Sequence, residues 1–293
     1  MRNGDSYMEI LENEELGKHS TFKIGGPAKY YAIPSGVDEV KEAIEYARNK
    51  NLPYLIIGKG SNILFHDRGY DGVVIEIGSK MQIIERIDDL NIRAEAGASL
   101  SALSNYAANA SLAGLEFAAG IPGTVGGGVT MNAGAYGGEI VDCIQSATVL
   151  DKDGNVRVLQ ANELDLSYRS SIIQKEDYIV LDATFQLIPG DENDIRATMR
   201  DYNGRRRDKQ PLEYASAGST FKRPKDNFAG KLIEDAGLKG YSVGDAQVSE
   251  KHCGFVVNKG NATYSDVKAV IEHVQKVVKE QFDVELETEV KIV

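Results

Sequence analysis

Apolar residues recur at three- and four-residue steps in several parts of the chain, which is the spacing of an amphipathic helix. The clearest case is the helix predicted over residues 264–281, where Ser265 is expected to cap the N-terminus. Its apolar stripe consists of Val267, Val270, Ile271, Val274 and Val278. The same spacing predicts a helix over 37–49, with Ser35 and Asp38 as a capping box. Further helices are predicted at 99–110, 192–206 and 227–235.

Short β-prone runs lie between these helices, bounded by glycine, proline or polar turn residues. The sequence Lys-Asp-Gly-Asn at 152–155 separates two such runs and predicts a hairpin. Strands are predicted at 21–24, 29–32, 54–57, 63–65, 73–77, 92–96, 147–151, 156–159, 178–187, 254–257 and 284–292. Because helices and strands do not alternate regularly, we predict an α+β chain and not a doubly wound sheet. Its three linked units are expected at 1–78, 79–208 and 209–293.

Composition narrows the class of protein. Of the 293 residues, 42% are hydrophobic and 26% are charged, as in soluble globular proteins. The net charge of −11 argues against general nucleic-acid binding. No apolar run has the length of a signal peptide core or of a membrane span, so we expect no membrane insertion. Cys143 and Cys253 are expected to be reduced thiols in the cytoplasm, and the four histidines form no metal-binding pattern.

The run from 117 to 138, FAAGIPGTVGGGVTMNAGAYGG, is rich in glycine and contains no charged residue. Glycine loses more backbone freedom on folding than other residues, so this density needs a structural reason. One reason is close approach of the backbone to a ligand, with successive N–H groups converging on an anion such as a pyrophosphate. The alternative is a set of tight turns between buried strands. Val125, Val129 and Met131 favour a packed segment over a flexible linker.

A second glycine loop, Gly-Lys-Gly-Ser-Asn at 58–62, follows a predicted buried strand. It is not a dinucleotide-binding fingerprint of the Rossmann type, because Ile63 occupies the place of the third glycine and a strand-like run follows. Alone, this loop is equally consistent with an ordinary turn. Together with 117–138, it predicts two separate loops that hold one extended dinucleotide.

Positive charge is concentrated between residues 196 and 231. This window contains ten Lys or Arg and four Asp or Glu, a local excess of six positive charges in an acidic protein. Such a field suits a small polyanionic substrate. For residues 196–207, a solvated helix face is the alternative.

Seven motifs, taken in order, resemble those of the UDP-N-acetylenolpyruvoylglucosamine reductase family. They are KHSTFKIGGPA (18–28), IIGKGSNILF (56–65), GLEFAAGIPGTVGGGVTMNAGAYGGEI (114–140), SYRSS (167–171), AGSTFKRP (217–224), AGKLIEDAGLKG (229–240) and LETEV (286–290). The resemblance extends from about residue 17 to residue 293. It is to the shorter type of this family, which lacks the long substrate-capping insertion.

The resemblance implies the FAD-binding fold of the vanillyl-alcohol oxidase type, in two α+β subdomains, followed by a C-terminal α+β substrate-binding domain. It implies NADPH-dependent reduction of UDP-N-acetylglucosamine enolpyruvate to UDP-N-acetylmuramate, with non-covalently bound FAD, for bacterial peptidoglycan synthesis. It therefore places the enzyme in the cytoplasm, and we expect it to be a monomer.

The resemblance also implies catalytic residues. Ser219 resembles the proton donor and Arg169 resembles the arginine that stabilises the enolate, although without this context they would be a turn cap and a surface ion-pair partner. Glu289 resembles a glutamate near the same intermediate. Glu287 would share its strand face, so spacing alone leaves both open, and the motif register selects Glu289.

Binding residues are expected in the glycine loops and in the basic region. Lys209 occupies a family position that contacts substrate or cofactor, whereas Lys222, Arg223, Lys231 and His252 are substrate-binding candidates from local charge. The cofactor-binding candidates are Gly58, Lys59, Gly60, Ser61, Asn62, Gly120, Ile121, Pro122, Gly123, Thr124, Gly126, Gly127, Asn132, Gly134 and Ala135.

Two other functions remain open at this point. One is a flavin-dependent oxidase of alcohols or sugars with the same fold, which would consume oxygen and need no NADPH. The other is a nucleotide-sugar-binding protein without catalytic activity, which would carry no flavin.

Overall fold

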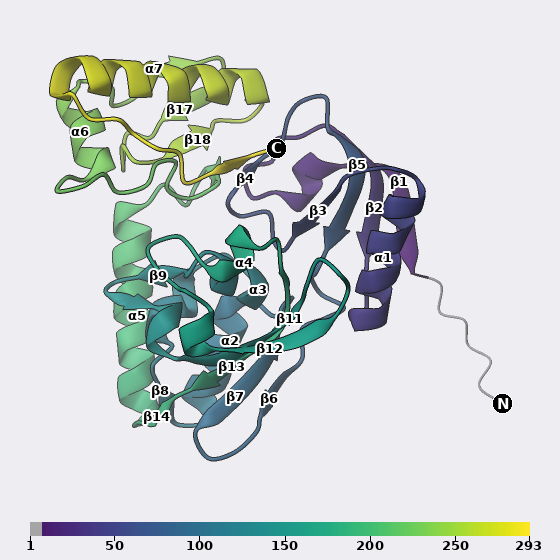
Figure 1. The fold of residues 1–293 in the computed structure, drawn as a ribbon. Helices are drawn as coiled ribbons and strands as arrows, with labels where there is room; N and C mark the ends of the chain where they lie inside the picture. The colour runs from purple at the N-terminus through teal and green to yellow at the C-terminus, as the bar shows by residue number, and fades with distance from the viewer. Residues whose placement is uncertain (1–7) are drawn as a thin grey trace. The chain divides into compact units, whose positions relative to one another are not determined.

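The computed structural model describes residues 8–293, and these form two compact units, each assembled from separate stretches of chain (Figure 1). The N-terminal unit holds the described residues up to 11, together with 30–59 and 72–205. The C-terminal unit holds 12–29, 60–71 and 206–293. The division of the chain at 78 and 208 stays a prediction.

Six sheets contain all the strands among residues 8–293. A four-stranded sheet has the order β1 (Glu9–Glu15), β2 (Pro27–Ile33), β5 (Tyr70–Glu76) and β3 (Tyr54–Ile57). A five-stranded antiparallel sheet has the order β12 (Val156–Gln160), β11 (Ile144–Leu150), β13 (Ile179–Gln186), β7 (Asn91–Glu95) and β6 (Ile84–Arg86). A second four-stranded sheet has the order β15 (Ala215–Ser216), β18 (Val256–Asn258), β17 (Ala246–Val248) and β16 (Ser242–Val243). Three small pairs join β9 (Gly134–Ala135) to β10 (Gly138–Glu139), β8 (Leu112–Ala113) to β14 (Ile188–Pro189), and β4 (Ile63–Leu64) to β19 (Lys291–Ile292).

Helices cover the sheets or connect their strands. The α-helices are α1 (Val37–Asn49), α2 (Leu100–Asn109), α3 (Val125–Thr130), α4 (Ile172–Lys175), α5 (Glu192–Lys209), α6 (Ala229–Asp235) and α7 (Tyr264–Phe282). The 3₁₀ helices are Leu16–His19, Glu116–Gly120, Ile140–Asp142 and Ala161–Glu163. The observed mixture confirms the predicted α+β class.

Helix α1 shows how an apolar stripe forms the core of the N-terminal unit. Its buried Val40 and Ile44 belong to the same cluster as Val73 and Ile75 of β5. The predicted bounds of this helix are confirmed, but the predicted capping box is wrong. Gly36 is the N-cap residue. The backbone N–H of Ser35 donates to Glu39 Oε2 at 2.7 Å. The acidic residue that accepts from the backbone just before the helix is therefore Glu39 and not Asp38.

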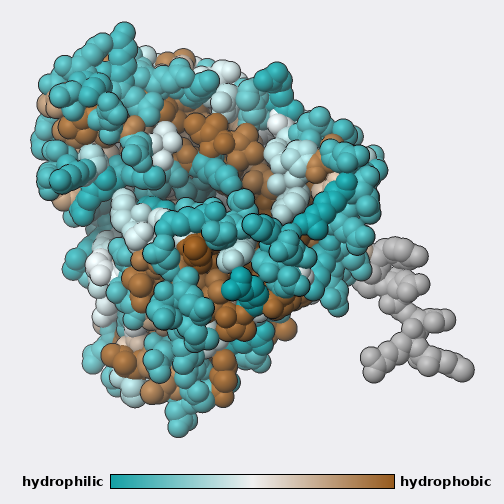
Figure 2. Space-filling model, in the orientation of Figure 1, coloured by the Kyte–Doolittle hydropathy of each residue, from teal (hydrophilic) through white to brown (hydrophobic). Residues whose placement is uncertain are grey.

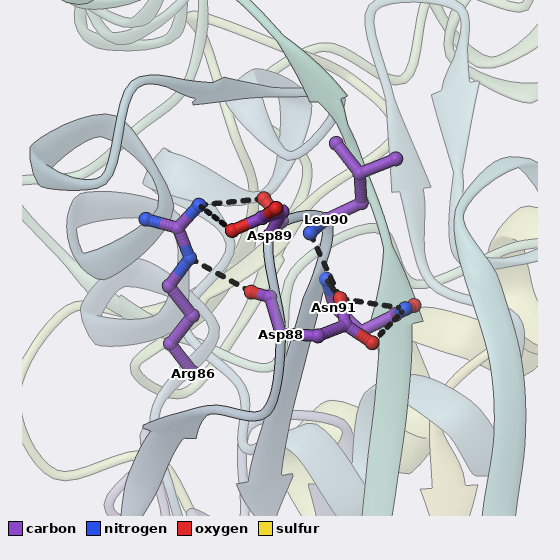
Figure 3. Close-up of polar contacts among 5 residues, drawn as sticks. All are labelled: Arg86, Asp88, Asp89, Leu90 and Asn91. Atoms are coloured by element: carbon purple, nitrogen blue, oxygen red, sulfur yellow. Dashed lines mark hydrogen bonds and ion pairs between the residues drawn. The ribbon is translucent and has the colours of Figure 1, made fainter.

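The five-stranded sheet contains two tight hairpins. The turn predicted at 152–155 is confirmed, and the Asp151 carboxylate accepts from the backbone N–H of Asp153 at 3.0 Å and of Asn155 at 2.8 Å. The other hairpin joins β6 to β7 and was not predicted, because β6 is only three residues long. In it, Asp88 Oδ1 accepts from the N–H groups of Leu90 and Asn91, both at 2.9 Å (Figure 3).

The C-terminal unit packs α7 across the sheet of β16, β17 and β18 (Figure 1). All five residues of the predicted apolar stripe are buried, which confirms that prediction. The observed N-cap of α7 differs from the predicted one. Thr263 is the N-cap residue, its Oγ1 accepts from Asp266 N at 3.1 Å, and Asp266 Oδ2 accepts from Thr263 N at 2.9 Å. Ser265 lies inside the helix, so the predicted cap was two residues too late.

Two predicted strands are wrong for physical reasons. Residues 21–24 form a turn in which Lys23 has a φ of 57° and its N–H donates to Ser20 O at 3.1 Å. Residues 284–292 form a strand only at β19. This stretch changes partners along its length, because Glu289 N donates to Thr220 O whereas Lys291 N donates to Asn62 O. A ladder with one partner therefore cannot form over the whole stretch.

The distribution of hydrophilic and hydrophobic residues on the surface agrees with the overall composition. Figure 2 shows a face on which hydrophilic residues predominate and hydrophobic residues gather in separate patches. Over the residues that the structure describes, no helix has both the length and the apolar character needed to cross a membrane. Within the same part of the chain, no group of His, Cys, Asp and Glu has an arrangement that could hold a metal ion.

The observed cap of α7 gives a first test. We expect Thr263→Ala to lower the free energy of unfolding by about 1 kcal/mol, because it removes the acceptor of an N-terminal N–H group. Ser265→Ala is the matched control and should change that free energy by less than about 0.5 kcal/mol. Urea unfolding followed by far-ultraviolet circular dichroism measures both. Equal effects of the two substitutions would contradict the assignment of the cap.

Candidate active site

The two glycine loops approach each other within the N-terminal unit at Gly58 and Thr124. A Cβ atom placed on Gly58 would lie only 2.3 Å from Thr124 Oγ1, so no other residue fits at position 58 without displacing that side chain. Thr124 is the N-cap of α3, and its Oγ1 accepts from Gly127 N at 3.4 Å. The end of β3 and the start of α3 therefore form one continuous surface.

Four of the eight glycines of the 117–138 run, Gly126, Gly128, Gly134 and Gly138, have packing roles. A Cβ atom on Gly126 would lie 2.9 Å from Ala96 Cβ, and one on Gly138 would lie 2.7 Å from Phe117 Cδ1. Glycine here lets α3 and the β9–β10 hairpin lie directly against their neighbours. The run contains a short helix and a hairpin, and it is therefore more than a set of turns between strands.

The expected convergence of successive N–H groups on an anion does not hold for the start of α3. Three backbone N–H groups at this helix start already donate to backbone carbonyls of the protein. They are Val125 N to Ala98 O, Gly126 N to Ala96 O and Gly128 N to Thr124 O, each at 2.8 Å. Gly127 N also has a partner, Thr124 Oγ1, but Gly127 is exposed, and a Cβ atom there would meet only that same oxygen, at 3.6 Å. The backbone at Gly127 is thus the part of this turn that a ligand can approach.

The loop at 58–62 continues from the N-terminal into the C-terminal unit. Gly60 has a φ of 58°, and a Cβ atom there would lie 2.2 Å from His19 O, so this turn requires glycine. Asn62 Nδ2 donates to Glu289 O at 3.1 Å. Of the other cofactor candidates, Gly120 ends a 3₁₀ helix, Gly123 O accepts from Leu100 N at 3.1 Å, and the remaining ones lie beside them or in β9.

Arg169 lies on a tight turn of the N-terminal unit. Ser167 and Ser170 exchange both backbone hydrogen bonds across it, at 3.0 and 3.1 Å, and Arg169 between them has a φ of 54°. Its guanidinium donates to Asn132 O and to Gly134 O, both at 3.4 Å. The guanidinium carbon also lies 5.1 Å from the centre of the Tyr168 ring. The side chain is therefore oriented by several contacts at once.

In the C-terminal unit, the segments that carry Ser219 and Glu289 run antiparallel to each other. Phe221 and Thr288 form a β-bridge, and Glu289 N donates to Thr220 O at 2.9 Å. Thr220 is itself fixed, because its N–H donates to Gly254 O and its Oγ1 accepts from Val256 N. Ser219 and Glu289 were predicted from separate motifs, and the structure places both on this one pair of segments.

The two glutamates of the LETEV motif have different environments. Glu287 pairs with Lys222, with Nζ to Oε2 at 3.1 Å, and 74% of its side chain is exposed. Glu289 is partly buried, and its backbone bonds to Thr220 and Asn62. These environments favour Glu289 as the functional residue, in agreement with the motif register.

The predicted basic substrate ligands differ in availability. Lys222 pairs with Glu287 and Lys231 pairs with Asp235, so each already has an acidic partner. Arg223 lies over the Phe228 ring, with 4.2 Å between the guanidinium carbon and the ring centre. Lys209 is exposed at the C-terminal end of α5. An anionic ligand must therefore compete with internal carboxylates at two of these positions.

His252 is half-buried and is not a source of positive charge at neutral pH. Its Nδ1 accepts from Gly254 N at 3.1 Å, and its ring lies 5.1 Å from that of Phe255. Burial lowers the pKa of this imidazole. We therefore correct the expectation that it binds by local charge: a neutral ring donates from Nε2 when Nδ1 accepts.

Sequence reasoning missed Ser171, which is completely buried and donates from Oγ to Thr130 O at 2.5 Å. The signal was the last serine of SYRSS, a motif that was interpreted only for its arginine. Sequence reasoning also placed Asn132 among the cofactor ligands, but it could not show that this residue is completely buried.

Comparison with known proteins defines the class. A sequence model of the FAD binding domain matches residues 28–160, and a model of the UDP-N-acetylenolpyruvoylglucosamine reductase C-terminal domain matches residues 210–293. The chain is accordingly a flavin-dependent oxidoreductase with the predicted FAD-binding fold and a further C-terminal domain.

Full-length relatives identify the family. UDP-N-acetylenolpyruvoylglucosamine reductase from Lachnoclostridium phytofermentans is 53% identical over 296 residues, covering 100% of this chain and 96% of the relative. The enzyme of the same name from Agathobacter rectalis is 54% identical over 295 residues, with 97% and 94% covered. The crystal structure of the Thermus caldophilus reductase matches with a TM-score of 0.84 and 35% identity, covering 98% of this chain and 99% of that one. This chain belongs to the UDP-N-acetylenolpyruvoylglucosamine reductase family.

Gly126 and Gly127 provide a paired test of the cofactor surface. We expect Gly127→Ala to keep the fold, because its Cβ fits, but to weaken FAD binding by about tenfold if the cofactor lies against this turn. Gly126→Ala should instead lower the free energy of unfolding by about 1–3 kcal/mol, because Ala96 must move. Thermal unfolding and titration of the apoprotein with FAD separate the two effects. Unchanged FAD affinity in a folded Gly127→Ala protein would remove this residue from the cofactor site.

The environment of His252 predicts a pH effect on stability. Because its pKa is lower in the folded state, the unfolded chain binds the proton first as the pH falls below about 6.5. Stability from the neutral ring is therefore present above that pH and declines below it. We expect His252→Gln to have a flatter dependence of the urea midpoint between about pH 7 and 5. The same slope in both proteins would show that this ring does not contribute.

Proposed function

We propose that this chain reduces the enolpyruvyl group of UDP-N-acetylglucosamine enolpyruvate to give UDP-N-acetylmuramate, using NADPH and FAD, in peptidoglycan precursor synthesis. The observation that carries the proposal is membership of the reductase family over the whole chain, through both the FAD-binding and the C-terminal regions. The antiparallel pairing of the Ser219 and Glu289 segments supports it, because it brings two motifs of the family together on adjacent segments.

The residues around Gly58 and Thr124 fit a FAD molecule. Gly58 and Thr124 are themselves uncharged and carry little side-chain bulk, the exposed backbone at Gly127 lies beside Thr124, and the charged Lys59 follows Gly58 in the chain. We assign Gly58, Lys59, Thr124 and Gly127 as residues that hold the cofactor. When bound, FAD supplies the hydride relay between NADPH and the enolpyruvyl double bond.

Reduction of the double bond leaves negative charge next to the substrate carboxylate and a carbon that must take a proton. We assign proton donation to the hydroxyl of Ser219, which follows Gly218 in a turn with a φ of 73°. A Cβ atom on Gly218 would meet nothing within 4 Å, so the turn beside this serine has open space for a substrate. The fixed fork of Arg169 suits the stabilisation of the developing charge. Glu289 would act next to the same carbon.

Substrate anions are assigned to the basic residues of the C-terminal unit. Lys209 is the strongest of these assignments, because it is exposed and occupies a family position. Lys222 and Lys231 would exchange a carboxylate partner for a phosphate. His252 would contribute a neutral hydrogen bond to the nucleotide part of the substrate.

Three finer assignments complete the proposal. The enzyme is a monomer, it works in the cytoplasm where NADPH and nucleotide sugars are made, and its FAD-binding part divides near residue 78 into two subdomains. Light scattering after size exclusion tests the first of these, and a dimer would contradict it.

The direct test follows NADPH oxidation by the purified protein under anaerobic conditions, with and without UDP-N-acetylglucosamine enolpyruvate. We expect rapid oxidation only with the enolpyruvyl sugar. Absence of stimulation, together with oxygen consumption on addition of an alcohol, would indicate an oxidase instead. A protein that binds the nucleotide sugar but carries no flavin would indicate a binding function.

Ser219→Ala tests the proposed proton donor. We expect turnover of the enolpyruvyl sugar to fall by about 10²–10⁴-fold, because proton transfer is lost while the binding surfaces remain. The rate at which NADPH bleaches the flavin absorbance should stay within about threefold of wild type. Ser216→Ala removes a neighbouring hydroxyl and serves as the control. Normal turnover in Ser219→Ala would exclude this role.

A further inference from the structure

The turn that carries Arg169 is fastened at both ends to one short stretch of the glycine-rich segment. At its first residue, Ser167 O accepts from Asn132 Nδ2 at 3.2 Å. Just after its last residue, Ser171 Oγ donates to Thr130 O at 2.5 Å. The guanidinium itself reaches Asn132 O. The SYRSS motif and residues 130–132 therefore form a single clamp around the arginine.

Asn132 is the centre of this clamp, and both of its side-chain amide hydrogens have acceptors. Besides the bond to Ser167, Nδ2 donates to Glu139 Oε2 at 2.8 Å, and Oδ1 accepts from Val141 N at 3.0 Å. The residue has no exposed surface and a φ of 46°, a left-handed conformation that asparagine accepts more readily than most residues. A side chain with these bonds has no remaining amide hydrogen for a cofactor.

Arg169 needs such support because its own backbone is strained. A non-glycine residue with a φ of 54° in a two-residue turn persists only where the surroundings determine the conformation. The bonds from Asn132 and Ser171 supply that determination. Without them, the turn can relax and the guanidinium moves with it.

We propose that Asn132, assisted by Ser171, is a positioning residue that fixes the guanidinium of Arg169 for transition-state stabilisation, and that its side chain is not a FAD ligand. This inference rests on the proposed function, in which Arg169 stabilises negative charge next to the substrate carboxylate. A displacement of about 1 Å at such a group can cost about 10²-fold in rate. The expected signature is therefore a loss of kcat with little change in cofactor binding.

Three single variants test the proposal in the FAD-loaded enzyme. Asn132→Gly tolerates the left-handed backbone and keeps the carbonyl that Arg169 contacts, but loses the amide. Ser171→Ala removes the second fastening and provides a separate route if Asn132→Gly does not fold. Ser104→Ala is the matched control, because it removes an equally buried hydroxyl that donates to a backbone carbonyl, Leu115 O, at 2.8 Å. All three are compared for Tm, bound FAD, flavin reduction by NADPH, kcat and KM.

We expect Asn132→Gly and Ser171→Ala to lower kcat by about 10- to 100-fold, with bound FAD and flavin reduction within about threefold of wild type. Ser104→Ala should retain wild-type kcat. In an Arg169→Ala background, Asn132→Gly should lower kcat by less than about twofold further, because its effect passes through the arginine.

Two results would overturn the inference. One is an equal fold-loss from Asn132→Gly with and without Arg169, which would mean that Asn132 acts independently. The other is loss of bound FAD in step with kcat, which would make Asn132 a cofactor ligand. Failure of the wild-type enzyme to oxidise NADPH with the enolpyruvyl sugar would contradict the proposed function instead, and is read from the unmutated protein alone.

Discussion

The close approach of Gly58 to Thr124 is the constraint on which the cofactor half of the molecule depends. Only hydrogen at position 58 lets the end of β3 reach the N-cap of α3, because a methyl group would lie 2.3 Å from the threonine hydroxyl. That contact places Gly58 and the start of α3 on one surface of the N-terminal unit. Thr124 Oγ1 has two roles there. It accepts from Gly127 N, and it borders the surface proposed for FAD.

The segments that carry the proposed catalytic residues in both units are held by bonds to segments distant in sequence. In the N-terminal unit, the turn of Arg169 is bonded to Asn132 and to Thr130. In the C-terminal unit, the backbone of Glu289 is bonded to Thr220 on one side and to Asn62 on the other. In each unit, an asparagine among the cofactor-binding candidates bonds to the segment of a catalytic candidate. Asparagine suits this task because one side chain supplies both donors and an acceptor.

Features that repeat along one segment, such as an apolar stripe, could be predicted from the sequence. Features that depend on which distant segment packs or pairs with it could not. The stripe of α7 could be located because burial repeats every three or four residues, but its cap is Thr263 and not Ser265, since both residues can cap and only the backbone decides. Residues 284–292 alternate like a strand, yet they divide their bonds between Thr220 and Asn62. Sequence motifs named Ser219, Arg169 and Glu289, but they could not show that Gly126 N bonds to Ala96 O, since that depends on the packing of two distant segments.

The pairing of β4 with β19 has a consequence for biosynthesis. Ile63 and Leu64 pair with Lys291 and Ile292, and Asn62 reaches Glu289 across 227 positions of the chain. During translation, the segment at 60–71 leaves the ribosome long before its partners exist. Leu64 belongs to a core cluster whose other members lie mostly between residues 217 and 290, so this core cannot be completed until that stretch has been made. A nascent chain arrested before residue 286 would still lack the partners of residues 60–71. This segment is therefore the one that chaperones would have to protect.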